Sequence, residues 1–326
     1  MLKDVPVPSP LAPDEVLVKT ELTGICYRDI LTTKGFFPRT KLPVVLGHEI
    51  AGRVAKLGSG VTGFREGDRV TSLIYEPCGK CEYCLSGREN LCRSKRTFGE
   101  DIDGSYADFV KINSRSLVKA PDGVSSAGLA ISACVTGMLM HAFRKRAALQ
   151  PGETVLVTGA GGGVGIHAVQ IAKALGARAI AATSSEWKAE SVKEAGASDV
   201  VVWTEGFGDE VKKLTDGRGV DVVLESVGGP TFGESMKSLA PGGRLVVVGN
   251  VLPSSVQFQL GVLILKELSI VGSISSVKKD VEDALKLTAE GKIKPVVHDT
   301  LPLEEASRGH KLMSDRATLG RLMLKP

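Results

Sequence analysis

The sequence lacks an excess of charge of either sign and lacks a long apolar segment. Its 326 residues include 41 lysines and arginines and 37 aspartates and glutamates, which gives a net charge of +4. So small a balance argues against nucleic acid or an acidic membrane surface as a partner. No run approaches the ~20 apolar residues that cross a bilayer, and no signal sequence opens the chain. We therefore expect a cytoplasmic protein that binds neither membrane nor nucleic acid.

Internal repeats, low-complexity segments and long linkers are missing as well, so ordinary globular domains are expected. The length is about twice that of a typical domain, and hydrophobic residues make up 43% of the chain. We predict a first domain over residues 1–122, a second over 123–274, and a C-terminal segment, 275–326, that returns to the first domain.

The first predicted domain is rich in Gly, Pro and Val. Short alternating runs at 15–19, 52–55 and 68–70 are separated by turn signals at 58–60 and 66–68. Short strands punctuated by glycines are typical of a β-rich, barrel-like domain.

The second predicted domain alternates apolar strands with helices. A strand at 154–158 is followed by a Gly-rich turn and a helix from 163 to 175. This alternation predicts an α/β domain with a doubly wound parallel sheet. The C-terminal segment should add a helix at 278–290 and a closing strand at 322–324. Further strands are expected at 177–183, 199–203, 220–225, 244–248 and 268–271, and further helices at 186–195, 208–215 and 231–239.

Four of the six cysteines follow the pattern Cys-x2-Cys-x2-Cys-x7-Cys, at Cys78, Cys81, Cys84 and Cys92. In an intracellular chain, cysteines are more often metal ligands or catalytic groups than disulfides. Short Cys-x2-Cys turns bring thiolates to one tetrahedral zinc ion, and four protein sulfurs leave no position for substrate. The pattern therefore predicts a structural zinc site, although a redox dithiol or an iron–sulfur cluster would suit similar spacings.

The Gly-rich turn follows a strand and opens a helix. Glycines let the backbone approach a pyrophosphate, whose negative charge is favoured at a helix N-terminus. In this setting the turn predicts a dinucleotide-binding site. The expected contacts are Gly161, Gly162, Gly163, Val164 and Gly165.

The end of the next strand bears on the choice between NAD and NADP(H). An Asp or Glu there would bind both ribose hydroxyls and select NAD. This chain has Ser184 and Ser185, with Lys188 one helical turn on. Small hydroxyls leave room for a 2′-phosphate that Lys188 can neutralise, which favours NADP(H). Either serine could instead merely cap the following helix, and Glu186 could accept a ribose hydroxyl.

A second set of candidate metal ligands is spread along the chain. Cys26 and His48 each lie in a Gly-bounded loop, and with Cys134 they offer the Cys2His set of a catalytic zinc. Water, substrate or Glu49 would take the fourth place, and Asp29 would orient the His48 ring. Taken singly, Cys26 could be a small buried residue and His48 a core histidine.

In this order the motifs resemble a zinc-type medium-chain dehydrogenase/reductase of the alcohol dehydrogenase superfamily, over nearly the whole chain. The resemblance implies a GroES-like catalytic domain and a Rossmann domain. It makes Cys26, His48 and Cys134 the ligands of a Lewis-acidic zinc that polarises a substrate oxygen during hydride transfer. The matching pieces are residues 24–29, 46–49, 67–70, the four-cysteine lobe, 133–137 and the Gly-rich turn.

Two positions depart from the alcohol dehydrogenase pattern. Arg28 stands where these enzymes carry a Ser or Thr that relays the alcohol proton, and a protonated guanidinium cannot accept that proton. Tyr27 replaces a His or Arg that often meets the cofactor phosphates, and we keep it as a cofactor-binding candidate. Both changes argue against alcohol oxidation.

The segments 26–29, 38–39, 134–138 and 249–251 resemble archaeal acryloyl-CoA reductases of the same superfamily. That resemblance implies a small-molecule substrate, NADPH-dependent hydride transfer to the β-carbon of an enoyl thioester, and a role for Arg28 at the enolate or at a substrate phosphate. Arg28 could instead form a structural ion pair with Asp29 or a neighbouring carboxylate, and related enoyl reductases work without the catalytic zinc. Further cofactor contacts are expected from Thr136, Gly249 and Asn250.

Two other functions stay open: a zinc alcohol dehydrogenase or ketone reductase, and a non-catalytic NADPH- and zinc-binding scaffold. His141, His167, His298 and His310 lie outside any ligand spacing and are expected to be structural or on the surface. Arg321 could reach the cofactor or be solvated.

The apolar run at 260–265 and the strand at 268–271 are expected to form an exposed sheet edge. The family pairs that edge between subunits, so a homodimer or homotetramer is expected. Family members usually begin with a further strand ahead of residue 5, which we expect either to be missing or to precede Met1.

Overall fold

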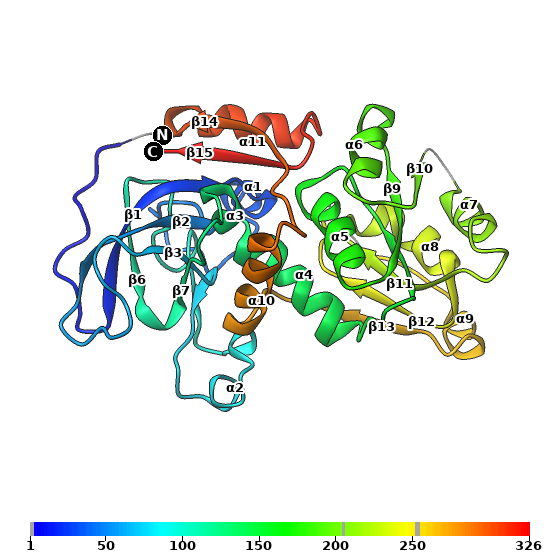
Figure 1. Ribbon diagram of the computed structural model, residues 1–326, viewed down its shortest axis with the longest axis horizontal. Coiled ribbons are helices and arrows are strands. Elements are labelled where there is room, and N and C mark those ends of the chain that lie inside the picture. Colours follow the sequence, from blue (N-terminus) through cyan, green and yellow to red (C-terminus); the bar gives the residue numbers. More distant parts are fainter. Residues whose placement is uncertain (1–2, 204–205, 252–254) are drawn as a thin grey trace. The chain divides into compact units, whose positions relative to one another are not determined.

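The computed structural model describes residues 3–203, 206–251 and 255–326. The chain forms two compact units (Figure 1). The first unit comprises Met1–Gly137, Ser275–Glu290 and Val297–Pro326, and the second comprises Met138–Ile274 and Gly291–Val296. Within the described ranges, no helix is long and apolar enough to cross a membrane.

The division between the units differs from the predicted one, because residues 123–137 belong to the first unit. Arg69 holds this segment by donating a hydrogen bond to the carbonyl oxygen of Val124 at 2.7 Å. Residues 291–296 belong to the second unit. The side chain of Gln170 fixes them, since it bonds both backbone groups of Lys294, at 2.7 and 3.0 Å.

A mostly antiparallel sheet of seven strands forms the first unit, in the order β14-β15-β1-β2-β3-β7, with β6 paired to β1. Its inward side chains, among them Val16, Val18, Ile50 and Val110, form one buried core. The strands are β1 (Glu15–Gly24), β2 (Ile50–Leu57), β3 (Arg69–Ser72), β6 (Phe109–Asn113), β7 (Leu117–Lys119), β14 (Val297–Pro302) and β15 (Arg321–Lys325), with a separate pair, β4 (Tyr75–Glu76) and β5 (Arg96–Thr97).

Short helices connect the strands of the first unit and carry several of its predicted site residues. They are α1 (Tyr27–Thr33), α2 (Glu82–Leu85), η1 (Glu89–Leu91), η2 (Ser114–Ser116), α3 (Ser126–Ala130), the π-helical turn η3 (Ser132–Gly137), α10 (Lys278–Ala289), η6 (Leu303–Glu305) and α11 (Ala306–Ser314).

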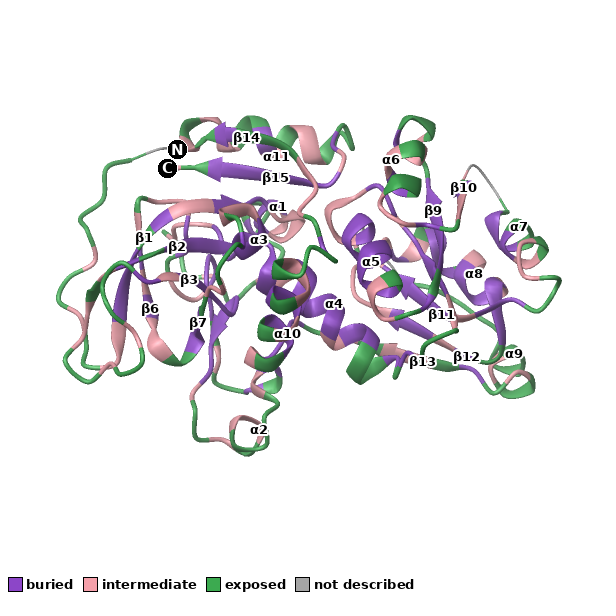
Figure 2. Cartoon of the chain, viewed as in Figure 1, coloured by how far each residue is buried: buried purple, intermediate pink, exposed green. Residues whose placement is uncertain are grey.

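The second unit contains a six-stranded parallel sheet in the order β10-β9-β8-β11-β12-β13. In chain order this is 3-2-1-4-5-6, the doubly wound arrangement of dinucleotide-binding folds. Residues of β9 and β11 are almost all buried, as parallel strands covered on both faces should be (Figure 2). The strands are β8 (Thr154–Val157), β9 (Arg178–Thr183), β10 (Asp199–Val202), β11 (Val220–Glu225), β12 (Leu239–Val247) and β13 (Ser269–Gly272).

The four helices predicted in the second unit are present, but the helical segment over 138–146 was not predicted, and one apolar run was assigned wrongly. The run at 260–265, expected at a sheet edge, is the helix α9, and only β13 forms the edge. Six apolar residues in a row have no period that separates a strand from a helix. The helices are α4 (Met138–Met140), the π-helical η4 (His141–Arg146), α5 (Gly163–Ala174), η5 (Glu186–Lys188), α6 (Ala189–Glu194), α7 (Phe207–Lys213), α8 (Gly229–Ser238) and α9 (Leu260–Leu265).

Candidate active site and metal centres

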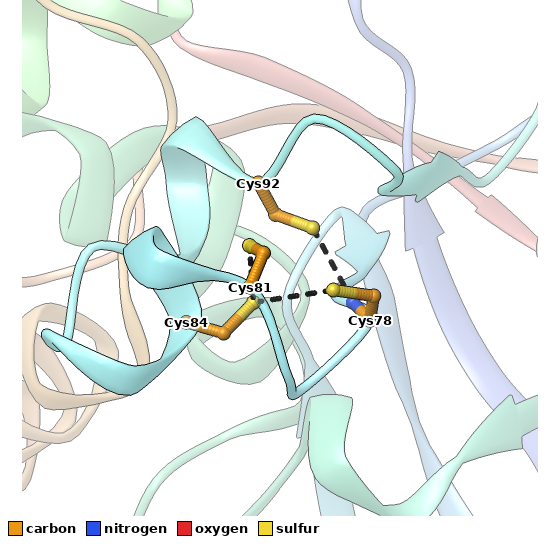
Figure 3. Close-up of side chains that lie close together, drawn as sticks. All are labelled: Cys78, Cys81, Cys84 and Cys92. Atoms are coloured by element: carbon orange, nitrogen blue, oxygen red, sulfur yellow. Dashed lines mark hydrogen bonds between the residues drawn. The ribbon is translucent and has the colours of Figure 1, made fainter.

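The four cysteines of the lobe converge on one point (Figure 3). Their Sγ atoms all lie within 4.8 Å of one another. Cys81 and Cys84 are 3.5 Å apart, and Cys78 and Cys84 are 3.9 Å apart. Zn–S bonds of about 2.3 Å in a tetrahedron place the sulfurs about 3.8 Å from one another. The lobe, completed by Cys92, therefore fits a closed tetrahedral zinc site.

Backbone amides of the lobe favour thiolates. Hydrogen bonds from the amides of Lys80 and Cys81 lower the pKa of Cys78 to about 6. Burial instead raises the pKa of Cys84 to about 12. Because a metal binds thiolates and displaces their protons, zinc affinity in this lobe should fall as the solution is acidified.

The second cluster joins Cys26, His48, Glu49 and Cys134, whose ligand atoms lie within 4.8 Å of one another. Cys26 is the N-cap of α1, His48 and Glu49 immediately precede β2, and Cys134 lies in the π-helical turn η3. The Sγ atom of Cys134 is 3.9 Å from Sγ of Cys26 and 3.5 Å from Nε2 of His48. A tetrahedral zinc with ordinary bond lengths requires about 3.8 and 3.6 Å. Cys26, His48 and Cys134 therefore fit a zinc ion.

Asp29 orients this cluster. Its Oδ1 lies 3.3 Å from Nδ1 of His48, which leaves Nε2 for a metal. Its Oδ2 accepts hydrogen bonds from the backbone N–H of Cys26 at 2.9 Å and from the hydroxyl of Tyr106 at 3.1 Å. Sequence reasoning missed Tyr106, because it stands 77 residues from Asp29 and outside any ligand spacing.

Charges within the cluster shift the pKa values of its ligands. The hydrogen bond from Cys134 and the charges of Arg321 and His48 lower the pKa of Cys26, against the effect of burial. The same hydrogen bond and burial raise the pKa of Cys134. Burial alone would lower the pKa of His48, but Asp29 and Cys26 outweigh it and raise that pKa to about 9. A metal entering at neutral pH must therefore displace protons from Cys134 and His48.

Glu49 and Arg321 form a buried ion pair in this region. Their exposed fractions are 0% and 5%. Nε of Arg321 donates to Oε2 of Glu49 at 3.0 Å, and Nη2 donates to Oε1. Arg321 is therefore not the solvated residue that the sequence allowed. Since both its oxygens are engaged, Glu49 is the weakest of the predicted metal ligands.

Arg28 pairs with a neighbouring carboxylate, that of Glu100. Nη2 donates to Oε2 at 2.9 Å and Nε donates to Oε1, in a two-point contact. The guanidinium carbon also lies 4.8 Å from the centre of the Phe37 ring. Burial alone would lower the pKa of Arg28, but Glu100 and the charges of Cys26 and Cys134 raise it. Arg28 thus forms the structural ion pair that the sequence allowed as an alternative, and Glu100 fixes its charge close to Cys26 and Cys134.

The Gly-rich turn lies in the second unit, between β8 and α5. Gly162 is the N-cap of α5 and, within the described residues, no side chain caps it. The first N–H groups of the helix are thereby suited to an anion. Gly159 has φ of +60°, and a Cβ on Gly165 would strike the Gly159 carbonyl oxygen. This close approach of turn and helix fits the pyrophosphate of a dinucleotide.

Lys188 covers this turn. A Cβ on Gly161 would lie 2.5 Å from Cδ of Lys188, so that glycine makes room for the lysine stem. Lys188 is only 7% exposed, and its Nζ lies 4.9 Å from the ring centre of Trp187. Ser185 is the N-cap of η5, but its hydroxyl makes no cap hydrogen bond in the described structure, and Ser184 is exposed. Helix capping therefore does not explain Ser185.

Gly249 and Asn250 lie beside the loop that follows β11. A Cβ on Gly249 would strike the carbonyl oxygen of Ser226, and Oδ1 of Asn250 lies against Gly228. The hydroxyl of Ser226 donates to the carbonyl oxygen of Thr158 at 2.7 Å, next to the Gly-rich turn. The structure thus brings these predicted cofactor contacts to the same edge of the sheet as the Gly-rich turn.

Glu225, the last residue of β11, is a buried carboxylate that the sequence reasoning did not single out as a site residue. A carboxylate at the end of a predicted parallel strand, followed by Gly228 and Gly229, was the available signal. The Glu225 carboxylate fixes the backbone at the start of α8 and at the Gly-rich turn. Its five donors, at 2.6 to 2.9 Å, are the N–H groups of Val227 and Gly228 and the hydroxyls of Thr158, Thr231 and Ser235.

Two predicted cofactor contacts lie in the first unit. Tyr27 begins α1, and Thr136 is buried in η3, where its hydroxyl donates to the carbonyl oxygen of Ser132 at 3.5 Å. Their contact with a cofactor stays a prediction.

Known proteins share both units. Residues 12–122 match the alcohol dehydrogenase GroES-like domain, and residues 163–290 match the zinc-binding dehydrogenase family. The chain is 48% identical to acryloyl-coenzyme A reductase of Sulfurisphaera tokodaii, over 100% of this chain and 96% of that one. It is 34% identical to an NAD-dependent alcohol dehydrogenase of the same organism, over 100% and 96%. The crystal structure of AibC superposes with a TM-score of 0.93 and 43% identity, over 99% of this chain and 90% of that one.

The sequence matches, the fold and both cysteine clusters thus indicate the same family. The chain belongs to the zinc-type medium-chain dehydrogenases/reductases of the alcohol dehydrogenase superfamily, and it is an oxidoreductase.

Proposed function

We propose that the protein uses NADPH to reduce the C=C bond of an α,β-unsaturated acyl thioester. The observation that carries this proposal is the Arg28–Glu100 pair close to Cys26 and Cys134. Hydride addition to the β-carbon leaves negative charge on the thioester oxygen, and a solvent proton then adds to the α-carbon. A fixed cation favours that charge, whereas alcohol oxidation needs a group that accepts the alcohol proton. The name of the 48% identical relative, acryloyl-coenzyme A reductase, supports the same reaction.

Cys26, His48 and Cys134 would hold a zinc ion, which supplies a Lewis acid for the carbonyl oxygen when bound. Asp29 keeps the His48 ring in the tautomer and orientation that this requires. Burial of the ligands strengthens electrostatic interactions, because few water molecules compete with them.

The reaction is tested by following NADPH oxidation with acryloyl-CoA and with a panel of ketones and aldehydes. We expect thioester turnover, and Arg28→Ser should lower kcat on it by roughly 100-fold, as the loss of one charge-stabilising group does. Arg28→Lys keeps the positive charge but not the two-point contact with Glu100. Its kcat should therefore lie between those of the wild type and Arg28→Ser. Rapid ketone reduction without thioester turnover would establish the alcohol dehydrogenase alternative instead.

The choice of NADPH is supported by Lys188 over Gly161 and by the two serines at the end of β9. One relative is named NAD-dependent, so both cofactors are compared directly. Lys188→Gln should lower the preference for NADPH over NADH by roughly tenfold, the effect of one weakened ion pair of about 1.4 kcal/mol. Lys193→Gln, an exposed site on α6, is the matched control. A wild-type preference for NADH would contradict the proposal.

Zinc content separates an enzyme from a scaffold. We expect two zinc ions per chain, one in each cysteine cluster. One ion per chain, together with no NADPH turnover on any substrate, would favour the non-catalytic scaffold.

We also propose a homodimer or homotetramer built on α9 and β13. In the part of the chain that the structure describes, the edge strand β13 is paired on one side only, with β12. Next to it in sequence, α9 exposes Ile264 and Leu265 by 73% and 87%. Such surfaces invite aggregation unless another chain covers them. Light scattering should show an oligomer that Ile264→Glu/Leu265→Glu dissociates, and a monomeric wild type would refute the proposal.

A further inference from the structure

The loop after α1, residues 34–42, is basic and aromatic and carries no acidic side chain. We call it the basic–aromatic loop. Its cations Lys34, Arg39 and Lys41 are all exposed. Its apolar residues Phe36 and Leu42 are also exposed, by 49% and 80%. Exposed apolar side chains among cations suit a ligand that has both an apolar arm and negative charges.

Among the described residues, the charged groups of these three side chains form no ion pair. Within the described residues, none of Lys34, Arg39 and Lys41 lies within 4.0 Å of a carboxylate oxygen, whereas most other arginines of the first unit do. Like charges so close in sequence repel one another, and a polyanion placed among them would relieve that repulsion.

The loop is fixed to the candidate active site through Glu100 and through Phe37. The carboxylate of Glu100 holds Arg28, while its backbone carbonyl oxygen accepts the N–H of Lys41 at 3.0 Å. The ring of Phe37 lies against the Arg28 guanidinium. The N–H of Thr40 also donates to the carbonyl oxygen of Phe37 at 3.0 Å, which closes a turn inside the loop. Arg28 and the basic–aromatic loop are therefore parts of one connected structure.

We propose that the basic–aromatic loop binds the phosphorylated carrier of the acyl thioester. Its cations pair with the phosphate groups, and Phe36 and Leu42 contact the apolar arm that links the phosphates to the sulfur. The inference rests on the proposed thioester reduction, and it assigns recognition of the carrier to a surface separate from the metal ligands. Free phosphate or the phosphates of NADPH would have the same chemistry, so the test includes both.

The test compares acryloyl-CoA with the short acryloyl N-acetylcysteamine thioester, which has no phosphate. In the double variant Arg39→Gln/Lys41→Gln, the ratio of kcat/KM for the CoA thioester to that for the short thioester should fall roughly tenfold, the fold-change expected from two exposed ion pairs. Raising the salt concentration should reproduce this fall in the wild type. The double variant Lys19→Gln/Lys56→Gln removes two other exposed lysines of the first unit and should leave the ratio unchanged.

An unchanged ratio would overturn the inference, because the loop then does not recognise the carrier. This holds also if activity falls equally on both thioesters. An unchanged ratio together with a raised KM for NADPH would assign the loop to the cofactor instead. If the wild type reduces neither thioester, the proposed function fails separately. Calorimetric titration with free CoA, against inorganic phosphate, then decides the inference: tighter CoA binding by the wild type than by the variant supports it, and equal affinities refute it.

Discussion

His167 should make the second unit sensitive to mild acid. The residue lies on α5 and is fully buried. Its Nδ1 donates to the carbonyl oxygen of Gly163 at 2.6 Å, and its Nε2 accepts the N–H of Val296 at 3.0 Å. One ring nitrogen must therefore carry a proton and the other must not, so the native structure requires the neutral imidazole. Burial accordingly lowers the pKa of His167 to about 4.

The sign and size of the effect follow from that pKa. Since the folded pKa lies below the ordinary value of about 6.5, the contribution of His167 to stability is complete above pH 6.5 and is lost as the pH falls towards 4. Proton linkage gives a loss of about 2 kcal/mol by pH 5 and about 3 kcal/mol by pH 4. These losses are large beside a total stability of about 5–15 kcal/mol.

The assay is the free energy of unfolding of the full chain, measured with denaturant between pH 7.5 and pH 5. Other groups also titrate in this range. The variant His167→Gln retains their contribution to the pH dependence, so the difference between the two proteins isolates that of His167. Glutamine can still accept the N–H of Val296 but cannot take up a proton. We expect the wild type to lose about 2 kcal/mol more than His167→Gln across this range. Equal losses in the two proteins would refute the reasoning about the neutral ring.

Three further predictions concern the two metal clusters and the nucleotide site. Cys26→Ser removes one of the proposed zinc ligands, so it should lower activity by more than roughly 100-fold with little change in Tm. Cys81→Ser should lower both Tm and zinc content. Metal analysis and calorimetry check both variants, and the reverse pattern would exchange the roles of the two clusters. Gly161→Ala would place a methyl group against Lys188 and should raise the KM for NADPH more than that for NADH in steady-state assays. Glu225→Gln keeps the acceptor for the four donors on Oε1. It should cost far less in unfolding free energy than Glu225→Ala, which leaves the N–H groups of Val227 and Gly228 unpaired at about 1–3 kcal/mol each. Equal costs for the two variants would contradict this.

Local patterns predicted most of the secondary structure because each rests on neighbouring residues. Apolar strands between glycines predicted β8 to β13, and the short cysteine spacing predicted the lobe. The run at 260–265 misled because every position in it is apolar or glycine, so no period separated α9 from a strand. The boundary after residue 137 was not predicted because α3 packs against β1 and β2, and η3 packs against α10, all of them distant in sequence.

The partner of Arg28 shows why the remaining contacts of the site could not be predicted from the sequence alone. Asp29 is next in sequence, but neighbours on a helix do not face each other. Both oxygens of Asp29 are also engaged, with His48 on one side and with Cys26 and Tyr106 on the other. Arg28 therefore pairs with Glu100, 72 residues away, and no spacing rule connects the two. The residue that marks the departure from alcohol oxidation is visible in the sequence, but the contact that fixes its charge beside Cys26 and Cys134 exists only after the first unit has folded.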